Sequence, residues 1–167
     1  MFPISNERRW QWKPMAIGAL AACALIVAPA MGAFGPLIEF GQPGHGPGTI
    51  GPHAPAIAVD AQGRVYVADI EDDRIEVFHN DGRPAGGWGA VAGPSGVAAA
   101  PDGSIVVADR NGVHRYEAGG ARLATLARSG DAVGSPAGVA VGADGTVHVA
   151  DSARGRVVAL GRAVYDG

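Results

Sequence analysis

The chain has 167 residues, of which 27 are glycine and 12 are proline, and 17% are charged. This length fits one domain, and the glycine and proline content favours short elements joined by turns. The formal net charge is −3, and an acidic chain with scattered arginines lacks the basic surface of a nucleic-acid-binding protein. The single cysteine, Cys23, excludes a disulfide framework within the chain.

Residues 1–34 are predicted to direct export. A basic stretch, RRWQWK, precedes an apolar stretch over residues 15–34, which is long enough to cross a bilayer as a helix. No Lys or Arg follows until Arg64, so the positive-inside rule sends the rest of the chain outward. The sequence therefore predicts a place in a bacterial-type cell envelope, on the exported side of the cytoplasmic membrane, anchored or secreted.

Three fates of this segment stay open. It can remain as a signal anchor, or it can be a signal peptide cleaved at the Ala28-Pro29-Ala30 sequence. It can also be a lipoprotein signal, because Leu20-Ala21-Ala22-Cys23 is similar to a bacterial lipobox. The sequence stays apolar beyond Cys23. This argues against a lipoprotein signal and favours Cys23 as a small side chain in a membrane helix.

An internal repeat follows. The triplet VAD ends at Asp69, Asp109 and Asp151, which are 40 and 42 residues apart. Each unit has an apolar run, a turn with glycine, a second run that alternates with a period of two, and a third apolar run. Such runs around short turns predict antiparallel hairpins, and the glycine-rich stretch after them has room for a weak outer strand.

Four short antiparallel strands in every ~40 residues are typical of a β-propeller blade. The units PAIAVDAQGRVYVAD, PSGVAAAPDGSIVVAD and PAGVAVGADGTVHVAD resemble the NHL repeat. The second unit departs from the pattern, because the loop after Asp109 is two residues shorter. We expect an all-β fold of four-stranded antiparallel propeller blades, an incomplete open arc of about three, preceded by an N-terminal hydrophobic helix.

The expected organisation is a signal anchor or signal peptide (1–34), a partial repeat or linker (35–54) and NHL-type repeats (55–167). The repeats divide at about 55–93, 94–135 and 136–167. The resemblance implies a six-bladed ring, and three blades cannot close one. Either the sequence is a fragment of a longer reading frame, or copies self-associate through open blade edges, which attract further strands.

The repeated carboxylates Asp69, Asp109 and Asp151 are predicted to be structural. An Asp at a strand end can accept hydrogen bonds from backbone N–H groups of the following loop, and one Asp per blade in the same place fits that role. His148 shares a column with Tyr66 and Val106, so it is expected to be half-buried.

Only the first unit carries Glu71, Asp72 and Asp73, in the loop between its second and third strands. Consecutive side chains cannot all point at one ion, so this loop is read as a solvated acidic loop or as a contact for a partner. His53 precedes the first strand on the same side. The resemblance implies a metal ligand at such a Pro-His pair, but His53 lacks partner histidines in the sequence. No partner is visible for His45, His79 or His114 either.

Two functions follow from these features. The first is an exported, membrane-tethered binding scaffold, not an enzyme, for a protein, peptide or glycan, held to the membrane through residues 15–34. The rival is part of a metal-dependent six-bladed lyase or lactonase, which the resemblance implies, with its site mostly outside this sequence. No cofactor is evident and no catalytic residue stands out, because the visible inner strands offer no converging metal ligands. A divalent metal ion stays open, since blades outside this sequence could supply ligands.

Overall fold

The structure is a computed structural model that describes residues 38–161. All regular elements in this range are β-strands. Within the same range, no helix is long and apolar enough to cross a membrane. The hydrophobic helix predicted for residues 15–34 lies outside the described residues.

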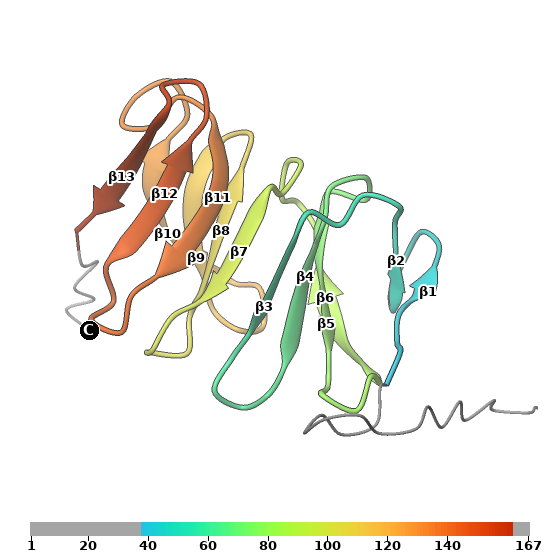
Figure 1. The fold of residues 1–167 in the computed structure, drawn as a ribbon. Coiled ribbons are helices and arrows are strands. Elements are labelled where there is room, and N and C mark those ends of the chain that lie inside the picture. Colours follow the sequence, from blue (N-terminus) through green and yellow to red (C-terminus); the bar gives the residue numbers. More distant parts are fainter. Residues whose placement is uncertain (1–37, 162–167) are drawn as a thin grey trace, which may run out of the picture. The chain divides into compact units, whose positions relative to one another are not determined.

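Three antiparallel sheets follow one another along the chain (Figure 1). The first contains β3 (Ala56–Val59), β4 (Val65–Asp69), β5 (Arg74–Phe78) and β6 (Pro84–Trp88). The second contains β7 (Gly96–Ala99), β8 (Ile105–Asp109), β9 (Gly112–Tyr116) and β10 (Arg122–Arg128). The third contains β11 (Pro136–Val141), β12 (Val147–Asp151) and β13 (Arg156–Leu160).

Strands that are consecutive in the chain are also neighbours in each sheet. This up-and-down order is that of propeller blades, so the predicted all-β class is confirmed, and the four-stranded arrangement is present in two sheets. The outer strand β6 forms from a glycine-rich stretch, whereas the outer strand β10 (RLATLAR) contains no glycine. The third sheet has three strands within the described residues.

A glycine turn closes each inner hairpin. Gly63, Gly103 and Gly145 have φ angles of 77°, 83° and 84°, a left-handed conformation that glycine adopts without steric cost. Each of these amides donates to the carbonyl three residues earlier, at 2.9–3.0 Å. The turn glycine therefore sets the hairpin register locally.

One element was not predicted. The segment before the first sheet forms a small parallel sheet of β1 (Gln42–Pro43) and β2 (Thr49–Ile50). Phe40 and Ile50 pack from this segment against a buried cluster of Val65, Val67 and Phe78. Residues 38–50 thus cover part of one face of the first sheet.

Two apolar seams join the sheets. We call the side of a sheet that faces the next sheet in chain order its forward face, and the other side its rear face. In the first seam, forward-face residues Tyr66 and Ile75 share a cluster with rear-face residues Val97, Ile105 and Val107. The inner strands β3 and β7 pack together, as do β7 and β11 (Figure 1).

The second seam repeats the same columns. Val106 and Val113 on the forward face of the second sheet share a cluster with Val147 and Val149 of the third. His148 points to the other side of β12 and is exposed, so the expectation of a half-buried His148 was wrong. Its counterparts Tyr66 and Val106 are buried because another sheet packs on them, whereas no described residue covers His148 in this way.

Candidate functional site

The three repeated aspartates lie at the ends of β4, β8 and β12 and are at most 3% exposed. Each carboxylate accepts backbone hydrogen bonds. Asp69 accepts the amide of Gly51 at 2.7 Å and those of Glu71 and Asp72 at 3.2 Å. It therefore ties the loop that follows β4 to the segment that precedes β3.

The donors differ in the other sheets. Asp109 accepts the amides of Asn111 and Gly112, at 2.7 and 3.1 Å, from the turn that follows it. Asp151 accepts the amides of Gly134 and Ser135, at 2.9 and 3.1 Å, from the connection that precedes its sheet. The position of the acceptor is thus conserved between the units, and the segment that it holds is not.

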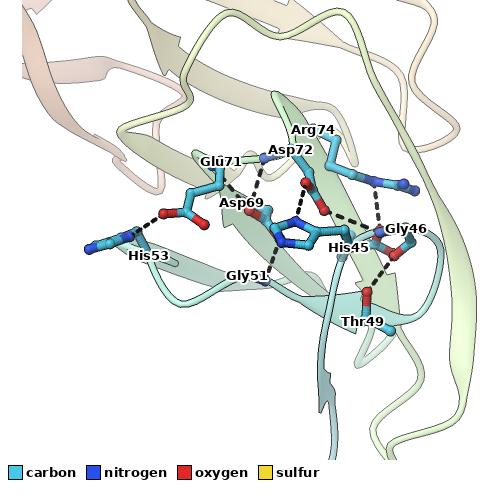
Figure 2. Close-up of polar contacts among 10 residues, drawn as sticks. His45, Gly46, Thr49, Gly51, His53, Asp69, Glu71, Asp72 and Arg74 are labelled. Carbon is cyan, nitrogen blue, oxygen red and sulfur yellow. Dashed lines mark hydrogen bonds and ion pairs between the residues drawn. The ribbon is translucent and has the colours of Figure 1, made fainter.

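The acidic loop of the first sheet, residues 70–73, meets residues 45–53 (Figure 2). His53 Nδ1 lies 2.5 Å from Glu71 Oε1, and His45 Nδ1 lies 2.8 Å from Asp72 Oδ1. Both imidazoles are mostly exposed. The loop is therefore more than a solvated turn, because two of its carboxylates are engaged by histidines from an earlier segment.

Asp72 is the better buried of the two carboxylates, with a side chain 16% exposed. It also accepts the amide of Gly46, at 3.2 Å. The hydrogen bond from His45 holds the pKa of Asp72 below its ordinary value, and the same bond raises the pKa of His45. A carboxylate and an imidazolium stabilise each other's charged form in this way.

Asp73 points to the second sheet. Its Oδ1 accepts the amide of Gly93 at 2.6 Å, and Arg110 Nη1 lies 4.0 Å away. The backbone of Asp73 is left-handed, with φ of 49°, which Asp tolerates better than most residues. Its side chain is still 55% exposed, so Asp73 can contact a further group.

A buried ion pair lies beside the acidic loop. Glu76 is fully buried, and its Oε1 lies 2.6 Å from Nε of Arg74. Its Oε2 accepts the amide of Gly48 at 3.1 Å. Burial raises the pKa of Glu76, because a carboxylate loses hydration there. Backbone amides of residues 46–51 thus donate hydrogen bonds to three carboxylates of the first sheet, those of Asp69, Asp72 and Glu76.

The arrangement brings His53 and Glu71 together, joins Asp72 to His45, and turns Asp73 toward Arg110. Its exposed oxygens can accept hydrogen bonds from a cationic group. Within residues 38–161, no group of three or more His, Cys, Asp or Glu side chains is placed to hold a metal ion.

Sequence reasoning missed His45, Arg74 and Glu76 as members of this site. His45 stands 27 residues before Asp72, in a stretch of glycine and proline without periodicity, so only the folded chain shows the pair. The alternation of RIEVF did signal one thing, namely that Glu76 lies on the same face as the buried Phe78.

His114 also has a partner that the sequence did not reveal. It is 1% exposed, and its Nε2 lies 3.2 Å from Asp109 Oδ1, while Nδ1 contacts Arg122. Burial alone would raise the pKa of Asp109, but hydrogen bonds from His114 and the amides of the turn outweigh it and lower that pKa. This buried group supports β9 and does not reach solvent.

Comparison with models of known families finds a match to part of the second sheet. Residues 92–115, from the connection before β7 to β9, match the model of the NHL repeat. The chain carries an NHL repeat. The NHL match falls on the unit with the shorter loop, the one that departs most from the expected pattern. No curated protein sequence matches the chain.

Solved structures with similar sheets include hydrazine synthase of Kuenenia stuttgartiensis, at 16% identity and a TM-score of 0.50, over 72% of this chain and 38% of that one. U3-55K matches at 16% identity and a TM-score of 0.50, over 73% and 40%. A streptogramin B lyase matches at 17% identity and a TM-score of 0.49, over 62% and 38%. The chain thus spans less than half of each of these proteins, and the likeness concerns the fold of the NHL unit and its neighbours alone.

Proposed function

We propose that this chain is an exported, membrane-tethered binding scaffold that holds a cationic segment of a protein or peptide on the acidic loop of its first sheet. One observation carries the proposal. Glu71 and Asp73 keep exposed carboxylate oxygens on a loop whose backbone is fixed by Asp69 and by residues 91–93 of the next connection. Loops on a rigid scaffold are the usual place for recognition.

The loop chemistry favours a cationic partner over a glycan. Carboxylates accept hydrogen bonds and attract Lys or Arg side chains, and charge-assisted bonds are about twice as strong as neutral ones. The tether is proposed from the apolar residues 15–34 and the basic stretch before them. A scaffold at a membrane surface would present the loop to soluble partners.

The test is binding of a fluorescent oligolysine peptide, with an oligoglutamate peptide as the reference, to the full chain in mild detergent. Glu71→Gln and Asp73→Asn each remove one negative charge and keep an oxygen that can accept the hydrogen bonds of His53 and Gly93. We expect each substitution to weaken oligolysine binding about two- to fivefold, as for loss of one exposed charge contact.

Asp81→Asn is the matched control, because Asp81 is an exposed carboxylate of the same sheet in the turn between β5 and β6. Equal losses in the control and in the loop variants would contradict the proposal, as would equal binding of both peptides. Metal analysis of the same preparation tests the rival lyase or lactonase. A stoichiometric metal whose removal by EDTA lowers the melting temperature would favour that rival.

A further inference from the structure

The outer faces of the first and third sheets form a complementary pair. Ile57 and Val59 on the rear face of the first sheet are 65% and 59% exposed. Val97, the residue of the second sheet that corresponds to Ile57, is 5% exposed because the first sheet packs on it. Ile57 and Val59 are therefore seam residues by position, and no described residue covers them as the first sheet covers Val97.

The forward face of the third sheet is the other half of such a seam. Ala140, His148, Ala150 and Ala159 are exposed there, and Val157 is 71% exposed. The same column is buried in the other two sheets, where it includes Tyr66, Ala68 and Ile75 in the first and Val106, Ala108 and Val113 in the second. The third sheet thus presents the surface on which, in both existing seams, a following sheet packs.

Both faces are hollowed. The rear hollow has about 470 Å³ and is lined by Ile38, Phe40, Ile57 and Glu39, among others. The forward hollow has about 410 Å³ and is lined by Ala150, Val157 and Arg156, among others. Arg156 is already paired with Asp151, at 3.4 Å, so the fit between the two faces rests on their exposed apolar side chains.

We infer that the forward face of the third sheet binds the rear face of the first sheet in a second copy of this chain. The contact reproduces the existing seams, with Ile57 of one copy against Ala150 and Val157 of the other, in the place that Val97 takes against Ala68 and Ile75. Phe40 and Ile50 already cover the outer part of the rear face, so on the first sheet the contact centres on the inner strand β3. It is head-to-tail, since two different surfaces meet.

Sedimentation of the full chain in mild detergent, up to about 100 µM, tests this association. The wild-type chain is expected to assemble. Ile57→Asp and Val157→Asp each place a charge in one half of the contact and are expected to weaken association by at least about tenfold. Ala121→Asp is the control, because Ala121 is exposed in the turn before β10, away from both faces.

Mixing the two blocked variants separates a head-to-tail contact from any other. The Ile57→Asp chain keeps an intact third sheet, and the Val157→Asp chain keeps an intact first sheet. An equimolar mixture is therefore expected to form a heterodimer through the one intact pair of faces. Differently tagged chains and co-purification reveal it.

A wild-type chain that stays monomeric would overturn the inference. So would association that survives in both single variants, since another surface would then carry it, or a mixture that does not pair. Circular dichroism shows whether each variant is folded, and Val59→Asp replaces Ile57→Asp if that variant is not. The outcome is independent of peptide binding by the acidic loop, because the two faces do not include Glu71 or Asp73.

Discussion

Among the described residues, Asp69 has a carboxylate that accepts hydrogen bonds from three backbone amides. Its buried carboxylate serves the amides of Gly51, Glu71 and Asp72, and these belong to two different segments. A buried carboxylate in this role orders both segments at once, because each amide would otherwise lack a partner in the folded state.

We predict that Asp69→Ala lowers the free energy of unfolding by about 3 kcal/mol, since each buried amide left without an acceptor costs about 1–3 kcal/mol. Asp69→Asn keeps one acceptor oxygen, so its loss is expected to be smaller. Urea unfolding of the full chain measures both. Asp81→Ala, in an exposed turn, serves as the control, and an Asp69→Ala variant as stable as that control would refute the role.

At the scale of elements, residues 42–53 depend on the first sheet. They contribute only two short strands. Side-chain bonds to Asp69, Glu71, Asp72 and Glu76, one backbone bond from Ile70 to His53 and the packing of Ile50 attach them to that sheet. His45 gives this attachment a pH dependence. The pKa of His45 is raised above its ordinary value of 6.5, so its share of the attachment is complete below that value and is lost as pH rises through the raised pKa.

The pKa of Asp72 is lowered, so the stabilisation that its carboxylate contributes to the attachment depends on pH in the opposite direction. It is present above the ordinary value of 3.8 and is lost as pH falls through the lowered pKa. Between those two limits both groups are charged. We predict that Asp72→Asn moves the pKa of His45 down toward 6.5, measured by NMR titration of the imidazole. Asp81→Asn should leave that titration unchanged, and an unshifted His45 in the Asp72 variant would show that the pair does not form.

The local parts of these elements could be predicted from the sequence. Alternation and the glycine turns fix each hairpin over fewer than twenty residues, and the repeated Asp marks the end of a strand. The attachment of residues 42–53 could not be predicted, because its bonds join residues 18–28 positions apart across a stretch of glycine and proline. The same holds for Asp151, because its backbone donors, Gly134 and Ser135, lie in the connection that precedes its sheet.

At the scale of the whole described chain, stability rests on the two seams. Their inner strands approach closely at Gly96, where an added Cβ would lie 2.9 Å from Gly138 Cα and from Val139 N. Both contacts are with backbone, so neither can give way by a change of rotamer. Gly138 occupies the corresponding position of the third sheet, and a Cβ added there meets nothing within 4 Å.

We therefore predict that Gly96→Ala lowers the free energy of unfolding by about 1–3 kcal/mol, because it overpacks the second seam. Gly138→Ala, the matched control, should be within about 0.5 kcal/mol of the wild type. Thermal and urea unfolding measure both variants. Equal stability of the two would mean that β7 and β11 do not approach as closely as the structure shows.

The seams also mark the limit of reasoning from the sequence about the whole chain. The alternation of VHVAD assigns His148 and Val147 to opposite faces correctly, and the repeat assigns His148 to a seam column. Whether that column is buried depends on what packs against it. No property of the strand itself decides this, so the sequence alone could not show that His148 is exposed.

The carboxylate anchors give the repeat a particular freedom to diverge after duplication. Asp69, Asp109 and Asp151 occupy one position, yet they hold amides from both sides, from the following turn and from the preceding connection. A copied unit therefore keeps its strand end even when the neighbouring loop changes in length or composition. New recognition chemistry can arise in such a loop by single substitutions, as the acidic residues found only in the first unit illustrate, while the buried columns stay as they were.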